Sequence, residues 1–146
     1  MGHHFGAVKL GTKNRYPFAV AGIRKISVFN IGEGGSKPAD FTVNNPKPSI
    51  ANLDIKSLQV GNKKNIQLTI NGAGFVGSSQ VALIIGKSAP QILPRLVVFK
   101  DNNFLENPVS NTMIVTGSAN DLKAGKIKVI NSSPGGGESN LVDFKP

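Results

Sequence analysis

The chain has 146 residues, a formal net charge of +9 and no cysteine, which excludes disulfides, thiolate nucleophiles and cysteine-based zinc sites. Histidine occurs only at positions 3 and 4, so a Ser-His-Asp arrangement cannot be built within the rest of the chain. Glycine, proline, asparagine and serine are frequent and β-branched residues dominate the apolar runs, which favours many short strands joined by turns.

The first elements predicted in chain order form a hairpin. Residues 24–30 alternate apolar and polar side chains, which indicates a half-buried strand. A glycine-rich turn over 32–35 and a short strand over 41–43 follow. Residues 44–48 read Asn-Asn-Pro-Lys-Pro, a linker in which two prolines stiffen the chain and block regular pairing.

A domain boundary is therefore predicted at this linker, with an extension over 1–47 and a complete domain over 48–146. Short alternating runs separated by turn residues predict the strands of this domain. They are 49–53, 65–71, 80–85, 95–99, 112–116, 126–130 and 140–144. Roughly seven short strands in about a hundred residues are typical of an immunoglobulin-like β-sandwich.

The end of the chain repeats a pattern found near its beginning. Residues 25–35 are an alternating strand, an Asn and a Gly-rich turn, and residues 40–43 are a short strand containing Phe41. Residues 126–144 repeat this order. A repeat at domain-sized spacing indicates tandem modules, so the extension reads as the last two strands of a preceding repeat.

One ordered set of residues resembles a known family. The set consists of Pro48-Ser49-Ile50, the run from Ile66 to Asn71-Gly72-Ala73-Gly74-Phe75, Gly125 to Asn131, Gly135 to Asn140, and Phe144. It is similar to the IPT/TIG domain of plexins, transcription factors and many bacterial surface proteins. The resemblance implies an all-β, E-set immunoglobulin-like sandwich over 48–146, and the Asn-Pro-x-Pro joint resembles that of bacterial repeat proteins.

The glycines of this set have structural interpretations. Gly72 and Gly74 are expected to let the chain turn sharply where a Cβ would clash, and Phe75 to fill the core behind them. Gly135, Gly136 and Gly137 are expected to adopt positive φ in the last hairpin. The sequence also contains the sequon Asn131-Ser132-Ser133, which a chance occurrence explains.

The function predicted from these observations is non-enzymatic. Acidic residues occur singly, mostly beside turns, which is not the paired arrangement that glycosidases use, and no regular calcium loop is present. We expect no catalytic residue, no cofactor and no metal. The resemblance implies a structural or adhesive module of a secreted or bacterial cell-surface repeat protein, whose partners are other copies or neighbouring immunoglobulin-like repeats. No run reaches the ~20 apolar residues of a transmembrane helix.

Two strands without the rest of their sandwich cannot bury both faces. The residues concerned, our candidates for strand exchange, are Ile26, Val28, Phe29, Phe41 and Val43. Three interpretations remain open: the extension is a piece of a neighbouring domain, it packs back on the complete domain, or it completes a sandwich in another copy.

The basic charge suggests a second class of function, a binding module for anionic polymers. The candidate contacts are Lys63, Lys64, Lys126 and Lys128, of which the last two share an outward strand face if alternation holds. A polysaccharide is favoured over nucleic acid, because no Lys/Arg run interleaved with aromatic residues is present. A soluble basic surface, or an accessory domain of a carbohydrate-active enzyme, are the alternatives.

Overall fold

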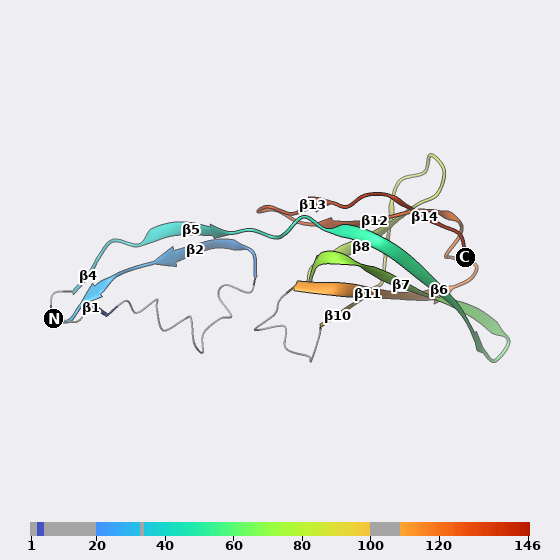
Figure 1. Ribbon diagram of the computed structural model, residues 1–146, viewed down its shortest axis with the longest axis horizontal. Coiled ribbons are helices and arrows are strands. Elements are labelled where there is room, and N and C mark those ends of the chain that lie inside the picture. Colours follow the sequence, from blue (N-terminus) through green and yellow to red (C-terminus); the bar gives the residue numbers. More distant parts are fainter. Residues whose placement is uncertain (1–2, 5–19, 33, 100–108) are drawn as a thin grey trace.

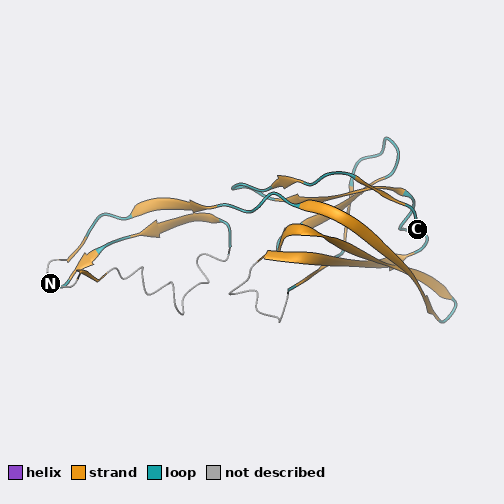
Figure 2. Cartoon of the chain, in the orientation of Figure 1, coloured by secondary structure: helices purple, strands orange, loops and turns teal. Residues whose placement is uncertain are grey.

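The computed structural model describes residues 3–4, 20–32, 34–99 and 109–146, and all regular elements within these ranges are β-strands (Figures 1 and 2). The first five strands are β1 (His3–His4), β2 (Gly22–Ile26), β3 (Phe29–Asn30), β4 (Gly34–Gly35) and β5 (Ala39–Val43). The others are β6 (Ser49–Val60), β7 (Lys63–Val76), β8 (Gln80–Ile84), β9 (Gln91–Leu93), β10 (Leu96–Val98), β11 (Val109–Ser118), β12 (Gly125–Asn131), β13 (Gly137–Glu138) and β14 (Val142–Phe144). The predicted all-β class is therefore confirmed.

Strands β6 to β14 form two antiparallel sheets that pack face to face as a β-sandwich (Figure 1). One sheet has the order β10–β11–β7–β6, and in the other β9, β8 and β12 are neighbours, with β13 and β14 both paired to β12. The chain passes from one sheet to the other between Leu93 and Leu96, because β9 pairs with β8 and β10 pairs with β11.

The core lies between these sheets and follows from strand alternation. Ile66, Leu68 and Ile70 on β7 are at most 4% exposed, and Ile127 and Val129 on β12 are fully buried. Both alternations were predicted. Each large side chain removed from water contributes about 1.5–3 kcal/mol to folding, so these inward rows hold the two sheets together.

All seven predicted strands of the domain are present, but their lengths differ. The hairpin of β6 and β7 extends beyond the predicted runs to a two-residue turn at Gly61, whose φ of +62° suits a tight hairpin. Ile55, Leu58 and Val60 in this extension are 36–62% exposed. Pairing with β7 rather than burial therefore defines this part of β6. The short strands β9 and β13 were not predicted, and most of the irregular segment expected over 101–110 lies outside the described residues.

The predicted sharp turn at Gly72 and Gly74 is wrong, because β7 continues through both glycines to Val76. The pairing with β11 shifts here. Ser110 lies opposite Phe75, but Thr112 lies opposite Asn71, so β7 has extra residues at this point and bulges. A Cβ on Gly72 would lie 2.0 Å from the Ser49 carbonyl oxygen. Glycine is needed for close approach of β6, and Phe75 is fully buried as predicted.

The N-terminal strands form a separate ribbon, defined here as residues 22–43. β2 pairs with β5, β3 pairs with β4, and β1 adds to β3 at the far end. The predicted hairpin is thus present. Figure 1 shows the ribbon extending away from the sandwich, and none of the ribbon residues that the structure describes belongs to the core cluster.

Candidate functional site

The linker between the ribbon and the sandwich is held by backbone hydrogen bonds. The Asn45 N–H donates to the Pro134 carbonyl oxygen at 2.8 Å, and the Gly136 N–H donates to the Asn45 carbonyl oxygen at 2.7 Å. The Asn45 side-chain amide also donates to the Ser132 carbonyl oxygen at 2.8 Å. These bonds fix residue 45 against the turn between β12 and β13, so the linker is stiffened by the sandwich as well as by its prolines.

A buried side chain secures the same junction from inside. Asn131, 2% exposed at the end of β12, donates to the carbonyl oxygens of Pro46 at 2.8 Å and Gly74 at 2.7 Å. Its side-chain oxygen accepts a hydrogen bond from the Ser79 hydroxyl. One amide therefore ties the linker, the β7 bulge and the start of β8 together. This burial also keeps Asn131 from serving as a glycosylation acceptor in the folded chain.

The glycine turn beside the linker allows this approach. Gly135, Gly136 and Gly137 have φ of +68°, +71° and +113°, as expected from the sequence. A Cβ on Gly135 would lie 2.5 Å from the Asn45 carbonyl oxygen. The turn is thus shaped for its neighbour in the linker. We call this arrangement of Asn45, Pro46, Asn131 and the glycine turn the clamp.

All five residues predicted for strand exchange are exposed or half-buried in the ribbon. Ile26, Val28 and Phe29 are 40%, 38% and 52% exposed, and Phe41 and Val43 are half-buried. Ile23, at 67%, and Ile31, at 75%, are also exposed and were not singled out from the sequence. The exposed apolar area of the ribbon is therefore larger than the sequence indicated.

Phe29 has a local role besides its exposure. Its ring lies over Gly35 of the paired strand, where a Cβ would come within 2.5 Å of a ring carbon. Covering a glycine with a cross-strand aromatic ring stabilises a hairpin. The ribbon is also supported by an ion pair of 2.8 Å between Lys25 and Asp40, although both side chains are well exposed and the pair contributes little.

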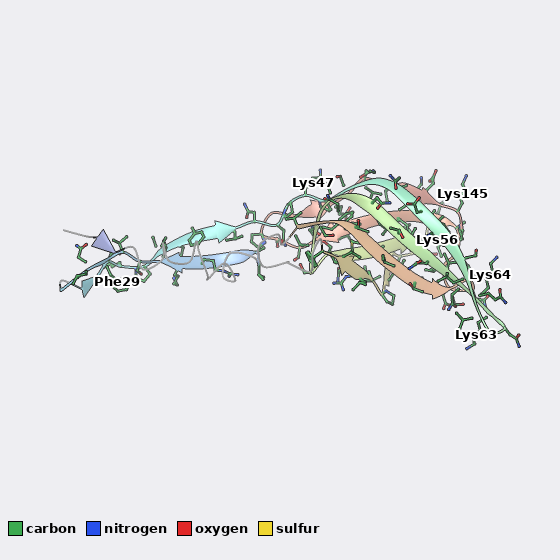
Figure 3. The ribbon with its side chains drawn as sticks, turned by 60° about the horizontal axis from the view of Figure 1, so that its bottom comes forward. Phe29, Lys47, Lys56, Lys63, Lys64 and Lys145 are labelled. Carbon is green, nitrogen blue, oxygen red and sulfur yellow. The ribbon has the colours of Figure 1, made fainter. Side chains whose placement is uncertain are left out.

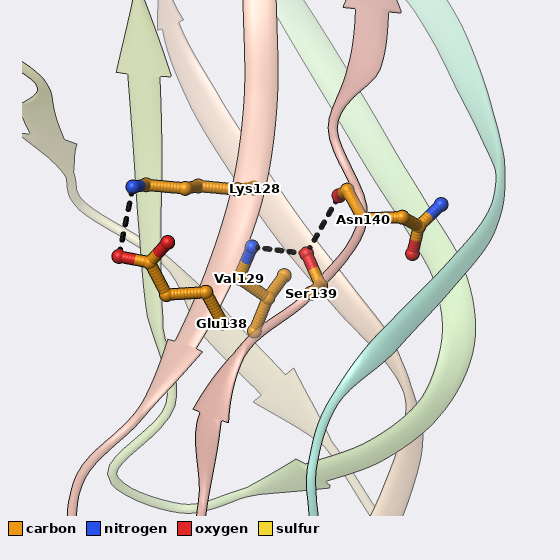
Figure 4. Close-up of polar contacts among 5 residues, drawn as sticks. All are labelled: Lys128, Val129, Glu138, Ser139 and Asn140. Carbon is orange, nitrogen blue, oxygen red and sulfur yellow. Dashed lines mark hydrogen bonds and ion pairs between the residues drawn. The ribbon is translucent and has the colours of Figure 1, made fainter.

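The four predicted lysines do not form one surface. Lys126 and Lys128 do share the outward face of β12, but each has an acidic partner: Asp143 at 2.7 Å and Glu138 at 2.9 Å. The hydrogen bond and positive charge of Lys126 lower the pKa of the Asp143 carboxyl below its usual value. Figure 4 shows the Lys128–Glu138 pair beside Ser139, which accepts a hydrogen bond from the Val129 N–H.

Lys63 and Lys64 lie elsewhere, at the tip of the β6–β7 hairpin in the other sheet. Figure 3 places them at the end of the molecule opposite to Phe29. Among the described residues neither forms an ion pair. The predicted group of four lysines is thus divided into a neutralised pair and a free pair.

Sequence reasoning missed a second polar connection. The Asn140 side chain accepts a hydrogen bond from the Ile50 N–H at 2.8 Å and donates to the Ile50 carbonyl oxygen at 3.0 Å. The Asn140 side chain thus bonds both backbone groups of Ile50, as a neighbouring strand would, and joins the start of β6 to the segment before β14. The only available signal was the Asn at the end of the Gly-rich segment, which does not reveal its partner.

Within the described ranges, no group of three or more His, Cys, Asp or Glu side chains is arranged to hold a metal ion. The part of the chain with assigned structure also contains no helix that is long and apolar enough to span a bilayer. No protein-family model, no curated protein and no solved structure matches the chain.

Proposed function

We propose that the chain is a structural and adhesive, non-enzymatic module of the immunoglobulin-like E-set type, similar to IPT/TIG repeats of secreted or bacterial cell-surface proteins. The strand order supports this proposal. With β6, β7, β8, β10, β11, β12 and β14 as strands A to G, one sheet is A-B-E-D and the other contains C-F-G. This is the order of immunoglobulin constant-type sandwiches, and β9 takes the place of an added C′ strand.

The observation that carries the functional proposal is the exposed apolar ribbon. Ile23, Ile26 and Phe29 are 40–67% exposed, whereas the inward-facing rows of the sandwich are almost completely buried. An isolated two-stranded hairpin is marginally stable in water, and its exposed apolar side chains are removed from water when a partner covers them. We therefore propose that a second copy covers the ribbon, so that copies join end to end.

Strand pairing provides a route to such assembly. Among the described residues β2 and β5 pair only with each other, and no other described strand lies along the outer edge of either. A strand from another molecule can add to such an edge, with main-chain hydrogen bonds giving affinity and alternate side chains giving specificity. The clamp holds the ribbon in one direction relative to the sandwich, which reduces the entropy lost on assembly.

Hydrogen exchange measured over a series of protein concentrations tests this proposal. Amides of 22–26 and 39–43 are expected to become more protected as concentration rises, whereas those of the β6–β7 tip should not change. The tip is a suitable internal control, because it is also an exposed hairpin. If the amide exchange rates of the ribbon do not depend on protein concentration, the ribbon has no role in contacts between molecules.

A further inference from the structure

The tip of the β6–β7 hairpin and the loop after β11 border a half-open cleft far from the ribbon. Its volume is about 600 Å³, within the range of roughly 300–1,000 Å³ that small-molecule sites occupy. The cleft is lined by Asn62, Lys63, Lys64, Asn65, Ser118, Ala119, Asn120 and Asp121. All of these except Ala119 carry polar side chains, so the cleft is suited to a polar ligand.

The side chains of the cleft define the class of ligand. Lys63 and Lys64 provide positive charge and have no ion-pair partner among the described residues. Three amides and one hydroxyl can both donate and accept hydrogen bonds, and Asp121 can accept from a hydroxyl group. A ligand rich in hydroxyl groups that also carries an anionic group complements this mixture of polar and basic side chains.

Two observations disfavour other anions. None of the described residues that line the cleft is aromatic, and single-stranded nucleic acids are bound largely by stacking bases on aromatic rings. Asp121 brings a negative charge to the cleft, which disfavours a dense polyphosphate. An acidic saccharide, with a carboxylate or sulfate group at intervals among neutral hydroxyl groups, fits this mixture of charges best.

The backbone around the cleft is held by hydrogen bonds and by one buried side chain. The Ala119 N–H donates to the Lys64 carbonyl oxygen at 3.0 Å, which joins the loop to the hairpin. The N–H groups of Asp121 and Leu122 both donate to the Ser118 carbonyl oxygen at 3.0 Å. Leu122 is 3% exposed and anchors the loop in the core. A preformed site loses less conformational entropy on binding.

We propose that this cleft binds an acidic saccharide through Lys63 and Lys64. The site lies at the end of the molecule opposite to the ribbon (Figure 3), so its binding is separate from assembly through the ribbon. A module joined to its copies at one end would then present a saccharide-binding tip at the other.

The test is an NMR titration of the whole chain with a tetrasaccharide of alternating glucuronate and N-acetylglucosamine. A neutral tetrasaccharide of N-acetylglucosamine and sodium sulfate at equal ionic strength are the comparison probes. The acidic probe is expected to shift the amides of 62–65 and 118–121. The Lys63→Gln/Lys64→Gln variant should bind it at least about tenfold more weakly, because charge-assisted hydrogen bonds are lost.

The Lys37→Gln/Lys87→Gln variant has the same change in charge and should bind like the unmodified chain. Equal binding of the neutral probe, equal shifts with sulfate alone, or unchanged affinity in the Lys63/Lys64 variant would each overturn the proposal. Tighter binding of a single-stranded oligonucleotide at the same residues would also overturn it. A chain with Ile26→Asp and Phe29→Asp should keep its saccharide affinity, which separates this proposal from assembly through the ribbon.

Discussion

The side-chain amide of Asn131 donates to the Pro46 carbonyl oxygen at 2.8 Å, although 85 residues separate the two in sequence. This bond places the linker directly against the end of β12. Because the amide also donates to Gly74 and accepts from Ser79, the position of the linker is coupled to the packing of the sandwich itself.

Replacing Asn131 should therefore destabilise the whole domain. Asn131→Ala removes the donor to the Pro46 and Gly74 carbonyl oxygens and the acceptor for the Ser79 O–H, which we expect to cost about 2–4 kcal/mol of unfolding free energy. Asn131→Asp should cost more, because a carboxylate oxygen would face the two carbonyl oxygens. Urea denaturation measures both values. Asn52→Ala, on the exposed side of β6, is the control and should cost less than about 1 kcal/mol.

The β7 bulge predicts a second stability difference, between two glycines of one short segment. Gly72→Ala would place a Cβ 2.0 Å from the Ser49 carbonyl oxygen, whereas a Cβ on Gly77 would meet no atom within 4 Å. Gly72→Ala is expected to cost about 2–3 kcal/mol, because β6 must move away. Gly77→Ala should change stability by less than about 1 kcal/mol. Equal thermal unfolding of the two variants would show that β6 does not approach Gly72 closely.

The clamp predicts a single orientation of the ribbon. The chain contains no cysteine, so spin labels can be attached at Thr42→Cys on β5 and Lys87→Cys on the sandwich. The distance distribution between the labels should be narrow. Gly136→Ala adds a Cβ 2.6 Å from two carbonyl oxygens at a φ of +71°, and should broaden it. A broad distribution of label-to-label distances in the chain with an unmodified clamp would mean that the linker is flexible.

The Asp143–Lys126 pair predicts a dependence of stability on pH. Lys126 lowers the folded-state pKa of the Asp143 carboxyl, so the ionised carboxylate stabilises the fold at pH values above the pKa of this group in the unfolded chain. The stabilisation by the carboxylate begins to decrease as the pH falls below about 4, the unfolded-state pKa, and is lost as the pH falls through the lower folded-state pKa. Asp143→Asn should therefore unfold at a lower temperature than the unmodified chain at neutral pH, by a small amount because the pair is exposed. The difference should vanish in strong acid, and a constant difference at every pH would contradict this assignment.

The inward rows of the sandwich could be predicted because they depend on alternation alone. Leu68 and Val129 are buried where a period of two places them. The extension of β6 could not be predicted, since Leu58 and Val60 are held by pairing with β7 and not by burial. Where a strand is stabilised mainly by its neighbour, its own sequence pattern is weak.

The site residues show the same limit. The outward direction of Lys126 and Lys128 follows from alternation, but their acidic partners are brought to them by β14 and β13. The roles of Asn131 and Asn140 depend on carbonyl groups 85 to 90 residues away. Single-sequence patterns do not contain such long-range pairing, so the clamp became visible only in the folded chain.

The central claim is that copies of the chain join through the ribbon, and light scattering over a range of concentrations at low and high salt tests it most directly. Ile26→Asp/Phe29→Asp places charges on the exposed apolar surface of the ribbon. Ile92→Asp, at a site on β9 that is 50% exposed, is the control for a charge placed on an exposed apolar position of the sandwich. The unmodified chain and the control should increase in mass with concentration at either salt level, whereas the ribbon variant should remain monomeric. A monomeric unmodified chain at all concentrations, or equal assembly of the ribbon variant, would contradict the claim.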